Sequence, residues 1–540
     1  MDIEIKRLDH LGIVAGVIKD LKLIEMIDER IKPDELEEIS TGEAVAGMIL
    51  NGLGFSQKPL SLTPQFFKNK PMEQLFREGV EADHFNRFKL GRSLDKAFNY
   101  GVDCLFSELS FPICKAEQVD LRFNDLDTTS FSLTGDYVPD TDEQAIHITH
   151  GYSKDHRADL KQAVLEMVVS QDGGIPLFCK CHDGNASDNE IFKHRANELI
   201  RQFKAGSIPR YLIMDSKGYT KKNAPNLAKV PYITRIPETF NDVKLLINQA
   251  LSWDDQWITI NKDYRFQCFE LGHYHIDQRW MVVYSQGAFE RAEKTLNKRS
   301  KKEDNSIEKQ LFHLQAQRFK TKKEASKALE ELSEKWKYHE IDEFHFHKHV
   351  KYAKKGKPTA DSPIKSIQWQ IKATFKRDEK RIAHAQHCKA CFVLGTSIPL
   401  NQLSNEDVFW GYKNQSQVER GFRFLKDPVF FVSSLFVKKP SRVQSLLMVM
   451  TLALLVYSIA QRRMRKKLEQ TGESLPNQIG QPTKTPTLRW VFQLLEGIDH
   501  VKIKIQNGYQ TVINGITDLH RKILKLFGNT VCRIYQIYST

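Results

Sequence analysis

The chain has 540 residues, of which 41% are hydrophobic and 27% are charged. This balance excludes a disordered tail and a fibrous repeat, and the length is enough for about three or four domains. An excess of 80 Lys and Arg over 67 Asp and Glu gives a formal charge of +13, which favours polyanions such as nucleic acid as partners. The eight cysteines follow no disulfide framework and no apolar signal region opens the chain, so we expect a reducing, cytoplasmic environment.

Residues 1–115 have the pattern of a helical N-terminal domain. Apolar residues recur at steps of three and four between positions 14 and 27, which predicts one helix. Ser40 and Glu43 have the spacing of a capping box at the start of a second helix. Residues 1–120 hold 15 basic and 21 acidic side chains, so simple packing competes with DNA or partner binding as the role of this domain.

From about residue 119 the pattern changes to short apolar runs that are typical of strands. We predict three consecutive antiparallel strands, then a helix and then a further strand, at 119–135, 145–152, 163–181, 189–204 and 210–215. Strands and helices in this order indicate a mixed α/β layout.

Residues 241–385 are interpreted as an insertion in that layout. Strands are predicted in the insertion at 257–260, 264–271, 279–285 and 367–375, and a further strand is predicted after it at 389–397. Residues 290–336 have the pattern of a charged helix with a flexible break at 298–306, and residues 354–363 are predicted to form a loop.

The last part of the chain begins with a helix predicted from about Glu406. The apolar run from Ser445 to Ala460 is shorter than the about 20 residues that a bilayer span needs, so we expect a core helix, with a membrane anchor as the lesser alternative. A linker at 471–487 then leads to a C-terminal unit, 488–540, in which Asn507-Gly508 predicts a hairpin that a helix follows.

Positive charge is concentrated in two zones. Residues 290–380 hold 24 basic and 15 acidic side chains, and residues 411–470 hold 12 and 3. Both zones together could form one surface for phosphates, and the second zone is the stronger indication of it. A lysine-rich solvated face is the alternative for either zone alone.

Two acidic residues interrupt apolar strands. Asp127 lies within one run and Asp215 ends another, and a carboxylate in such a place is costly without a positive partner. Paired divalent ions that are held by carboxylates would be such a partner and are typical of phosphoryl chemistry. A turn-capping role is the alternative for either residue, and Asp125 competes with Asp127 for the metal-binding role.

A polar stripe is predicted on the helix after Trp410. Tyr412, Gln415, Glu419, Arg423 and Lys426 share one face at steps of three and four. One carboxylate between cations suits a metal ligand beside phosphate contacts, but a salt-bridged solvent face has the same pattern.

Other signals are weaker. Cys388, Cys391 and His387 lack a second cluster that would complete a zinc site, and the histidines of the run 344–349 alternate with Phe as on a strand that exposes them. A glycine-rich nucleotide loop is missing, so we expect neither ATP nor NAD dependence.

Together these residues resemble the Asp-Asp-Glu transposases of bacterial insertion sequences, which have a ribonuclease H-like fold. The family pattern is tyrosine, two residues, arginine, three residues, glutamate, six residues, lysine, and Tyr412, Glu419 and Lys426 stand at these intervals. Gln415 replaces the arginine, which leaves its phosphate contact to Arg420 or Arg423.

The resemblance implies a ribonuclease H-like mixed sheet that helices flank and an insertion interrupts, with a helical N-terminal domain. The predicted parts are 1–115, the first part of the core at 119–240, the insertion at 241–385, the second part of the core with the Glu helix at 386–470, and 488–540.

The resemblance also implies a mechanism. Asp127, Asp215 and Glu419 would hold two Mg²⁺ ions, or Mn²⁺ in their place, for hydrolysis at the transposon ends and strand transfer into target DNA. Tyr412 and Lys426 would contact phosphates. We expect a bacterial cytoplasmic protein that joins the nucleoid when bound to double-stranded DNA, acts as a homodimer in a synaptic complex and has no membrane partner.

Some relatives insert an aromatic side chain at an unpaired base. Trp253, Trp257 and Trp280 are candidates for this role, with core packing as the favoured alternative. The competing functions are a two-metal nuclease without strand transfer and a catalytically silent DNA-binding protein derived from a transposase.

Overall fold

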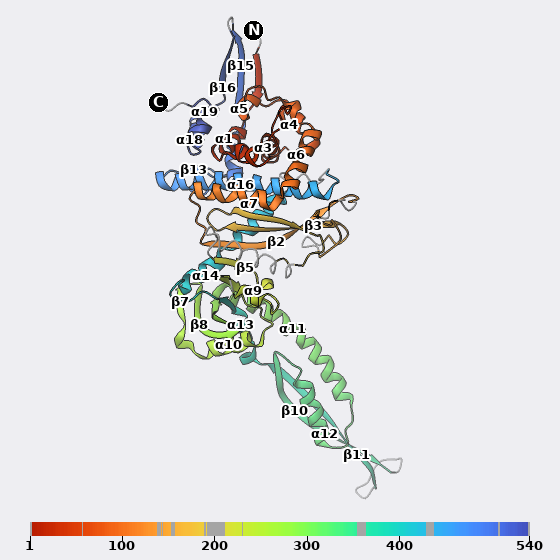
Figure 1. The fold of residues 1–540 in the computed structure, drawn as a ribbon. Helices are drawn as coiled ribbons and strands as arrows, with labels where there is room; N and C mark the ends of the chain where they lie inside the picture. Colours follow the sequence, from red (N-terminus) through yellow and green to blue (C-terminus); the bar gives the residue numbers. More distant parts are fainter. Residues whose placement is uncertain are drawn as a thin grey trace. The chain divides into compact units, whose positions relative to one another are not determined.

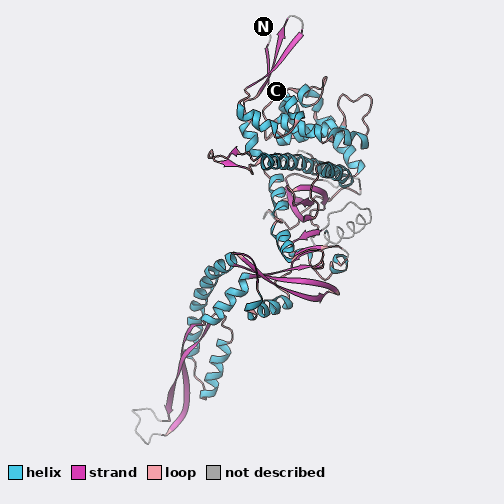
Figure 2. Ribbon diagram, turned by 90° about the vertical axis from the view of Figure 1, so that its left-hand side faces the viewer, coloured by secondary structure: helices cyan, strands magenta, loops and turns pink. Residues whose placement is uncertain are grey.

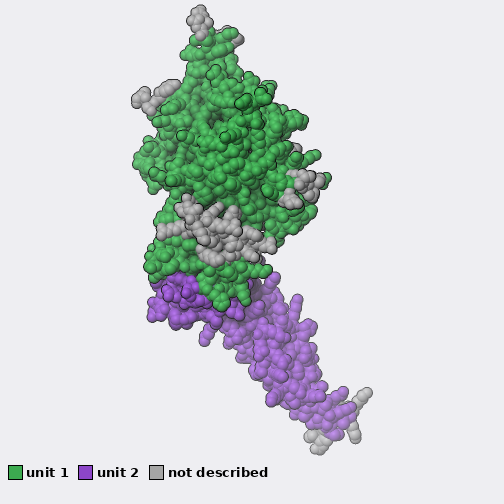
Figure 3. All heavy atoms as spheres, in the orientation of Figure 1, with its two compact units in different colours: residues 1–234, 274–276, 396–540 green, residues 235–273, 277–395 purple. Residues whose placement is uncertain are grey.

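The computed structural model of the chain has two compact units (Figure 3). Unit 1 comprises residues 1–234, 274–276 and 396–540, and unit 2 comprises residues 235–273 and 277–395. The described residues are 3–56, 58–137, 142, 144–152, 157–187, 191, 211–228, 230–353, 363–427, 437–505 and 508–537. Two predicted elements lie outside these residues: the helix at 189–204, apart from Ile191, and the loop at 354–363, apart from Pro363.

Helices form the first part of unit 1 (Figure 1). They are α1 (Leu11–Asp20), α2 (Leu23–Arg30), α3 (Thr41–Leu53), α4 (Thr63–Phe67), α5 (Met72–Leu75), α6 (Arg87–Tyr100) and α7 (Val102–Ala116), with short 3-10 helices η1 (Leu60–Leu62) and η2 (Ala82–Phe85). The single helix predicted between residues 14 and 27 is wrong, because Lys22 has a left-handed backbone conformation (φ 52°) that separates α1 from α2. The predicted capping box is confirmed: Ser40 Oγ accepts the Glu43 N–H at 3.0 Å, and Glu43 Oε2 accepts the Ser40 N–H at 2.8 Å.

The long helix α16 (Pro440–Thr471) lies between these helices and the sheet of unit 1 (Figure 1). Residues 443–460, which include the apolar run from Ser445 to Ala460, are buried on every side. The helix is long and apolar enough to cross a membrane, but its most apolar window is entirely buried within the protein. A helix that is hydrophobic all round and packed on all sides is a core helix, as predicted.

The sheet of unit 1 is mixed. Its strands are β2 (Phe123–Leu133), β3 (Lys161–Ser170), β4 (Ile175–His182), β5 (Tyr211–Met214) and β6 (Tyr232–Arg235). The spatial order is β4-β3-β2-β5-β6, in which β2, β3 and β4 are antiparallel neighbours, while β5 and β6 are parallel to β2. The prediction of a mixed α/β layout is therefore confirmed.

One predicted strand does not form. Within the described part of residues 145–152, only Thr149 makes a β-bridge, with Gln162. The reason is that β2 pairs with all of β3 along one edge and β4 covers the other edge from Val164 onward, so little of β3 is left for a further strand.

The two ends of the chain meet in a second sheet of unit 1. Strand β1 (Ile3–Arg7) pairs with β15 (Asp499–Ile505), which pairs in turn with β16 (Gly508–Asn514), and the three strands extend away from the helices (Figure 2). The predicted hairpin is confirmed by the β15–β16 pairing, although Asn507 itself lies outside the described residues. The partnership with β1 was not predicted.

Shorter elements complete unit 1. They are η3 (Ser216–Gly218), α9 (Ala224–Leu227), α14 (Asn405–Lys413), α15 (Ser416–Leu425), β13 (Leu475–Pro476), β14 (Pro482–Thr483), α17 (Leu488–Leu494), α18 (Asp518–Lys525) and α19 (Asn529–Ile534). The predicted linker 471–487 thus contains a small hairpin, β13–β14.

Unit 2 contains a sheet and a long helical hairpin arm. Its elements are α10 (Asn241–Ser252), η4 (Asp254–Gln256), β7 (Ile258–Asn261), β8 (Tyr264–His273), β9 (Ile276–Ser285), α11 (Gln286–Ala316), α12 (Lys322–Ser333), β10 (His339–Tyr352), β11 (Ile364–Arg377), α13 (Glu379–Ala390) and β12 (Cys391–Thr396). The strand order is β12-β9-β8-β7, and β10 and β11 form a separate two-stranded ribbon. All five strands predicted for this region are present.

The flexible break predicted at 298–306 is wrong. Helix α11 runs through these residues without interruption, because Ser300 and Ile307 face the interior and keep the apolar stripe in register. The helix ends at Ala316, and α12 begins after the capping side chain of Thr321.

Candidate active site

Asp127 and Asp215 lie on neighbouring strands of the sheet of unit 1. Strands β2 and β5 are parallel, with Leu126 opposite Met214. Asp127 and Asp215 are the next residues after Leu126 and Met214, so the two aspartates continue the same register. Adjacent strands lie about 4.8 Å apart. Residues that are 88 positions apart in the sequence are thereby brought side by side.

Both aspartates are half-buried, and each carboxylate is oriented by its own backbone. Asp127 Oδ1 accepts the Thr128 N–H at 2.7 Å, and Asp215 Oδ1 accepts the Ser216 N–H at 2.7 Å. Asp215 caps the 3-10 helix η3, so the turn-capping alternative applies to it.

Helix α15, which carries Glu419, packs on the face of the sheet that bears Asp127. Asp127 lies opposite Met167 of β3, and a Cβ on Gly421 would lie 3.0 Å from Met167 Cε, so this helix is in close contact with the same face. Farther along, Lys426 Nζ lies 5.7 Å from the centre of the Phe131 ring, four residues after Asp127 on β2. Val418, Phe422 and Leu425 are buried beneath the helix.

Asp125, the competitor of Asp127, has a different environment. Its side chain is fully buried, and Gln171 Nε2 donates to its Oδ1 at 2.7 Å and to the Gly411 carbonyl of α14 at 2.6 Å. Burial raises the pKa of Asp125 to about 8; the hydrogen bond from Gln171 opposes this, and the negative charges of Asp127 and Glu419 add to it. Asp125 therefore ties α14 to the sheet, whereas Asp127 remains partly accessible.

The predicted polar stripe is divided between two helices. Tyr412 lies near the end of α14, and Gln415 is the N-cap residue of α15 after a turn at Asn414, so the prediction of one continuous helix is wrong. Glu419 is in the first turn of α15 and is exposed.

The cationic members of the site follow Glu419 on α15. Arg420 and Arg423 are exposed, and Arg420 Nη2 donates to Ser416 Oγ at 3.1 Å. Lys426, half-buried against Phe131, ends the helix as its C-cap residue. The amphipathic pattern of the sequence thus separates a buried apolar face from an exposed face with one carboxylate and two guanidinium groups.

The three predicted metal ligands have the donor type that hard divalent ions prefer, because all are carboxylates. Among the residues that the structure describes, however, no group of three or more His, Cys, Asp and Glu side chains is arranged to hold a metal ion. The donor chemistry fits, and the backbone brings the three carriers to one face of the sheet.

The residues set aside in the sequence have mostly structural surroundings. Cys391 is buried, which raises the pKa of its thiol to about 12, and His387 packs against Phe289 with tilted rings whose centres are 4.9 Å apart. Trp280 is fully buried, as predicted for a core tryptophan, whereas Trp253 is 39% exposed. Trp257 is half-buried.

Three arginines of the second basic zone, all on α16, are engaged inside unit 1. Arg442 pairs with Asp95 at 2.6 Å, and Arg463 pairs with Glu117 at 2.5 Å. Arg462 forms a 2.6 Å pair with Asp172 and also donates to the carbonyls of Glu117 and Gln118. The expectation of a phosphate surface is therefore wrong for these three arginines, whose acidic partners are hundreds of residues away in the sequence.

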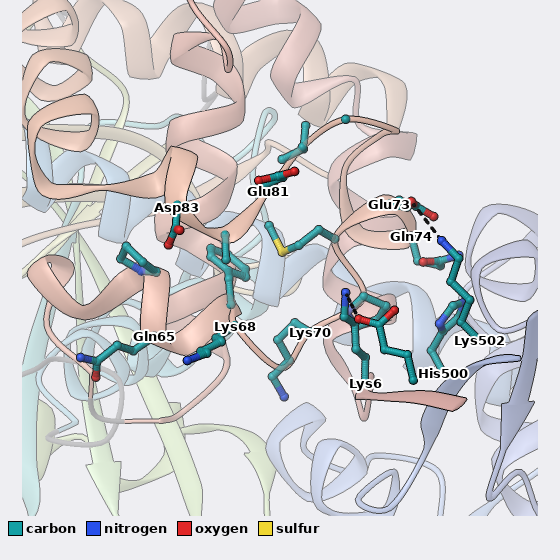
Figure 4. Close-up of a pocket in the computed structure, with 18 residues that line it drawn as sticks. Lys6, Gln65, Lys68, Lys70, Glu73, Gln74, Glu81, Asp83, His500 and Lys502 are labelled. Carbon is teal, nitrogen blue, oxygen red and sulfur yellow. Dashed lines mark ion pairs between the residues drawn. The ribbon is translucent and has the colours of Figure 1, made fainter. Parts of the chain in front are cut away.

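A cavity of about 570 Å³ lies elsewhere in unit 1, between the terminal sheet and residues 64–83 (Figure 4). Its rim carries both charges: Lys6 pairs with Glu4 at 2.9 Å, and Lys502 pairs with Glu73 at 3.6 Å. This cavity contains none of the predicted catalytic residues.

Comparison with known proteins identifies two matching families. The family described as "Transposase DDE domain" matches residues 120–456, and the "Domain of unknown function (DUF4277)" matches residues 3–111. No curated protein matches the chain. A cryo-EM structure of the piggyBac transposase synaptic complex with hairpin DNA is 10% identical, with a TM-score of 0.37 over 92% of this chain and 83% of that one. Since the transposase match spans more than half of the 540 residues, the chain belongs to the transposase DDE domain family.

Proposed function

We propose that the chain cleaves DNA at transposon ends and joins the new ends to target DNA. The single observation that carries this proposal is the register of β2 and β5, which sets Asp127 beside Asp215. Helix α15 then adds Glu419 on the face of the sheet that bears Asp127. Membership of the transposase family supplies the class of reaction.

The sheet supports a ribonuclease H-like core. Three antiparallel strands followed by two parallel ones, in the order β4-β3-β2-β5-β6, match the layout that we expected for such a core. In this arrangement the first strand to be made, β2, is central and carries the first aspartate.

Asp127, Asp215 and Glu419 are proposed to hold two divalent ions, Mg²⁺ or Mn²⁺. Bound ions of this kind make an attacking oxygen more nucleophilic and neutralise charge on the leaving oxygen. Transposases of the DDE family generally use divalent metals. The exposed position of Glu419 and the half-buried aspartates leave their oxygens accessible to such ions.

The remaining side chains are proposed to position DNA. In hydrolysis a water oxygen forms a bond to phosphorus, and the P–O3′ bond breaks to release a 3′-hydroxyl. In strand transfer the oxygen of that hydroxyl forms a bond to a target phosphorus, and the target P–O3′ bond breaks to release a 3′-hydroxyl on the target strand. Lys426, held over Phe131 at the end of α15, would fix a phosphate oxygen near the cut.

Further contacts to the DNA backbone are assigned to neighbouring residues of α14 and α15. Arg420 and Arg423 are exposed on the side of α15 that also bears Glu419, and Tyr412 and Gln415 lie just before it. We propose that two copies act together in a synaptic complex, with transposon-end and target duplexes as partners, on the bacterial nucleoid.

The test is a cleavage and joining assay on a linear duplex that carries the DNA flanking the gene, with Mg²⁺ present. Joined products indicate a transposase, nicks alone indicate a nuclease, and bound but uncut DNA indicates a silent binding protein. Asp127→Asn, Asp215→Asn and Glu419→Gln should each abolish cleavage while sparing binding. Glu406→Gln, an exposed glutamate of α14, is the matched control and should cleave normally. Normal cleavage by any of the three variants would remove that residue from the proposed triad.

A further inference from the structure

The outer part of the β10–β11 ribbon has an unusual charge distribution. We call residues 344–352 of β10 and 364–373 of β11 the distal ribbon. They contain four lysines and three histidines but no Asp or Glu. The acidic residues of the ribbon lie nearer its base, where Glu340 and Asp342 pair with Lys376 at 3.7 and 3.3 Å, and Glu343 Oε2 lies 3.8 Å from His345 Nε2.

The distal ribbon has two different faces, because side chains alternate along each strand. On the inner face, Phe346 lies opposite Ile371, which is fully buried against the helices α11 and α12. The outer-face residues form cross-strand pairs in which His345 lies opposite Lys372, His347 opposite Gln370, His349 opposite Gln368 and Lys351 opposite Ser366. The outer face is therefore polar, with Lys351 and Lys372 as its lysines, although the amide of Gln370 donates to the Gln315 carbonyl of α11.

The outer face is accessible. The His345 side chain is 74% exposed, and His347, Gln368 and Lys372 are also exposed. His349 is half-buried and hydrogen-bonds Gln370 at 2.6 Å. Among the described residues, Lys351 and Lys372 have no acidic partner.

The inner face holds the ribbon in a fixed position. Lys322 at the start of α12 lies 4.6 Å from the centre of the Trp369 ring, and Phe319 exchanges backbone hydrogen bonds of 2.8 and 2.7 Å with Trp369. At the base, His339 Nδ1 bonds Glu303 of α11 at 2.8 Å. The outer face is thus displayed on a supported scaffold (Figures 1 and 2).

A lysine-rich solvated face is the simpler explanation, and α12 shows what such a face looks like in this protein. That helix has three lysines and three glutamates, and Lys327 pairs with Glu331 one turn away at 3.6 Å. Interspersed charges of both signs keep a surface soluble without concentrating positive potential. The distal ribbon lacks the acids, so its field attracts polyanions.

We propose that the outer face of the distal ribbon docks in the major groove of duplex DNA. This inference rests on the proposed function and adds a duplex-binding surface on unit 2, separate from the carboxylates of unit 1. The major groove admits a two-stranded β-ribbon. Lys351 and Lys372 contact phosphates at its edges, while the imidazole of His347 and the amide of Gln368 face the donors and acceptors of the base edges.

The test uses the full chain and a fluorescent random-sequence duplex of about three helical turns, with anisotropy measured over a range of KCl concentrations. Lys351→Ala/Lys372→Ala should bind more weakly and flatten the log–log salt slope by about two, one for each lost phosphate contact. Lys323→Ala/Lys327→Ala, which removes two exposed lysines from α12, is the matched control and should keep the slope of the unmodified chain. Gln368→Ala should weaken binding without changing the slope.

Competition identifies the groove. Methyl green, which occupies the major groove, should displace the unmodified chain more effectively than the Lys351→Ala/Lys372→Ala variant, whereas the minor-groove ligand distamycin should affect both equally. Equal slopes for the ribbon and control variants, or selective displacement by distamycin, would overturn the proposal. An equal loss of binding to polyglutamate and to DNA would make the face a general polyanion site and would also overturn it.

Failure of the ribbon proposal can be distinguished from failure of the proposed function. If the unmodified chain binds no duplex at all, the proposed function fails together with the ribbon. If it binds and cleaves DNA but the ribbon variant is unaffected, only the ribbon proposal fails. Thermal unfolding of each variant checks the fold, and Lys351→Gln/Lys372→Gln, which retains most of the side-chain stems, replaces the alanine variant if that one unfolds.

Discussion

The helix α16 and the distal ribbon belong to the two basic zones of the sequence but use their charges in opposite ways. Three arginines of α16, Arg442, Arg462 and Arg463, lie against acids of unit 1, and Arg462 is only 12% exposed in its pair with Asp172. The two lysines of the outer face of the ribbon, Lys351 and Lys372, are exposed and have no acidic partner among the described residues. A surplus of charge in a sequence therefore indicates a ligand surface only after the pairing inside the fold is known.

The paired cations of α16 are arginines, whereas the cations on the outer face of the ribbon are lysines. The guanidinium of Arg462 donates to both carboxylate oxygens of Asp172 and to two backbone carbonyls, a geometry that a lysine cannot reproduce. Lysine is a point charge on a flexible stem and suits contacts with phosphates at variable positions. Arginines that pair with acids inside unit 1 and lysines that are proposed to bind DNA should therefore respond differently to substitution.

The largest expected effect is on stability. Arg462→Met should lower the free energy of unfolding by about 3 kcal/mol, because it leaves a partly buried Asp172 carboxylate without its partner. Urea denaturation measures the change. Arg489→Met is the control: its guanidinium is 43% exposed in the pair with Asp427, so the loss should stay within about 1 kcal/mol. Equal losses would mean that burial does not distinguish the two pairs.

The next effect is on binding. Lys372→Glu should weaken duplex binding by about tenfold at low salt, because it replaces one of the two lysines of the outer face with a negative charge. Lys323→Glu on α12 reverses an equally exposed charge outside the ribbon and should have a much smaller effect. Fluorescence anisotropy compares the two variants, and the urea midpoints of both should match that of the unmodified chain. A similar loss for both would show that only net charge matters.

The pH dependence of stability gives a third test. Burial alone would raise the pKa of Asp172, but the hydrogen bonds and charge of Arg462 and the hydrogen bond from the Asp120 N–H outweigh it, so this pKa lies below its usual value. Such a carboxylate stabilises the fold above the ordinary Asp pKa of about 3.9, and the contribution disappears as the pH falls through the lower, folded value. The unmodified chain should therefore lose more stability below about pH 4 than Arg462→Met does. Parallel pH profiles of the urea midpoint would contradict this assignment.

The smallest effect is expected at the base of the ribbon. Lys376→Ala should leave the urea midpoint of unfolding nearly unchanged, since its ion pairs with Glu340 and Asp342 are exposed. Because these acids already offset its charge, duplex binding should also change less than in Lys372→Ala. Both variants are measured by the same anisotropy titration. A larger effect at Lys376 would extend the binding face to the base of the ribbon.

Features encoded by neighbouring residues could be predicted from the sequence. Ser40 and Glu43 specify the start of α3 by themselves because both partners of the capping box lie within one turn. The apolar strands and the β15–β16 hairpin were predictable for the same reason. The break between α1 and α2 at Lys22 could not be predicted, because the apolar spacing continues across it. The left-handed backbone conformation of Lys22 alone ends the first helix.

Long-range partners could not be predicted in this way. Strand β1 pairs with β15 nearly 500 residues away, and no local pattern identifies this partner. Asp127 and Asp215 were identifiable as acids in apolar strands, but their adjacency depends on the parallel register of β2 and β5. The placement of Glu419 depends on the packing of Gly421 against Met167, which periodicity does not reveal.

The terminal sheet has a consequence for the order in which the chain folds during synthesis. Strand β1 leaves the ribosome first, but its partner β15 is synthesised almost 500 residues later. The helices of the N-terminal part likewise pack against α16, which is also synthesised later. Unit 2 needs only residues 235–395 and can be complete while more than a hundred residues are still to be translated. A nascent chain can thus complete the ribbon of unit 2 before it completes unit 1, which carries Asp127 and Asp215.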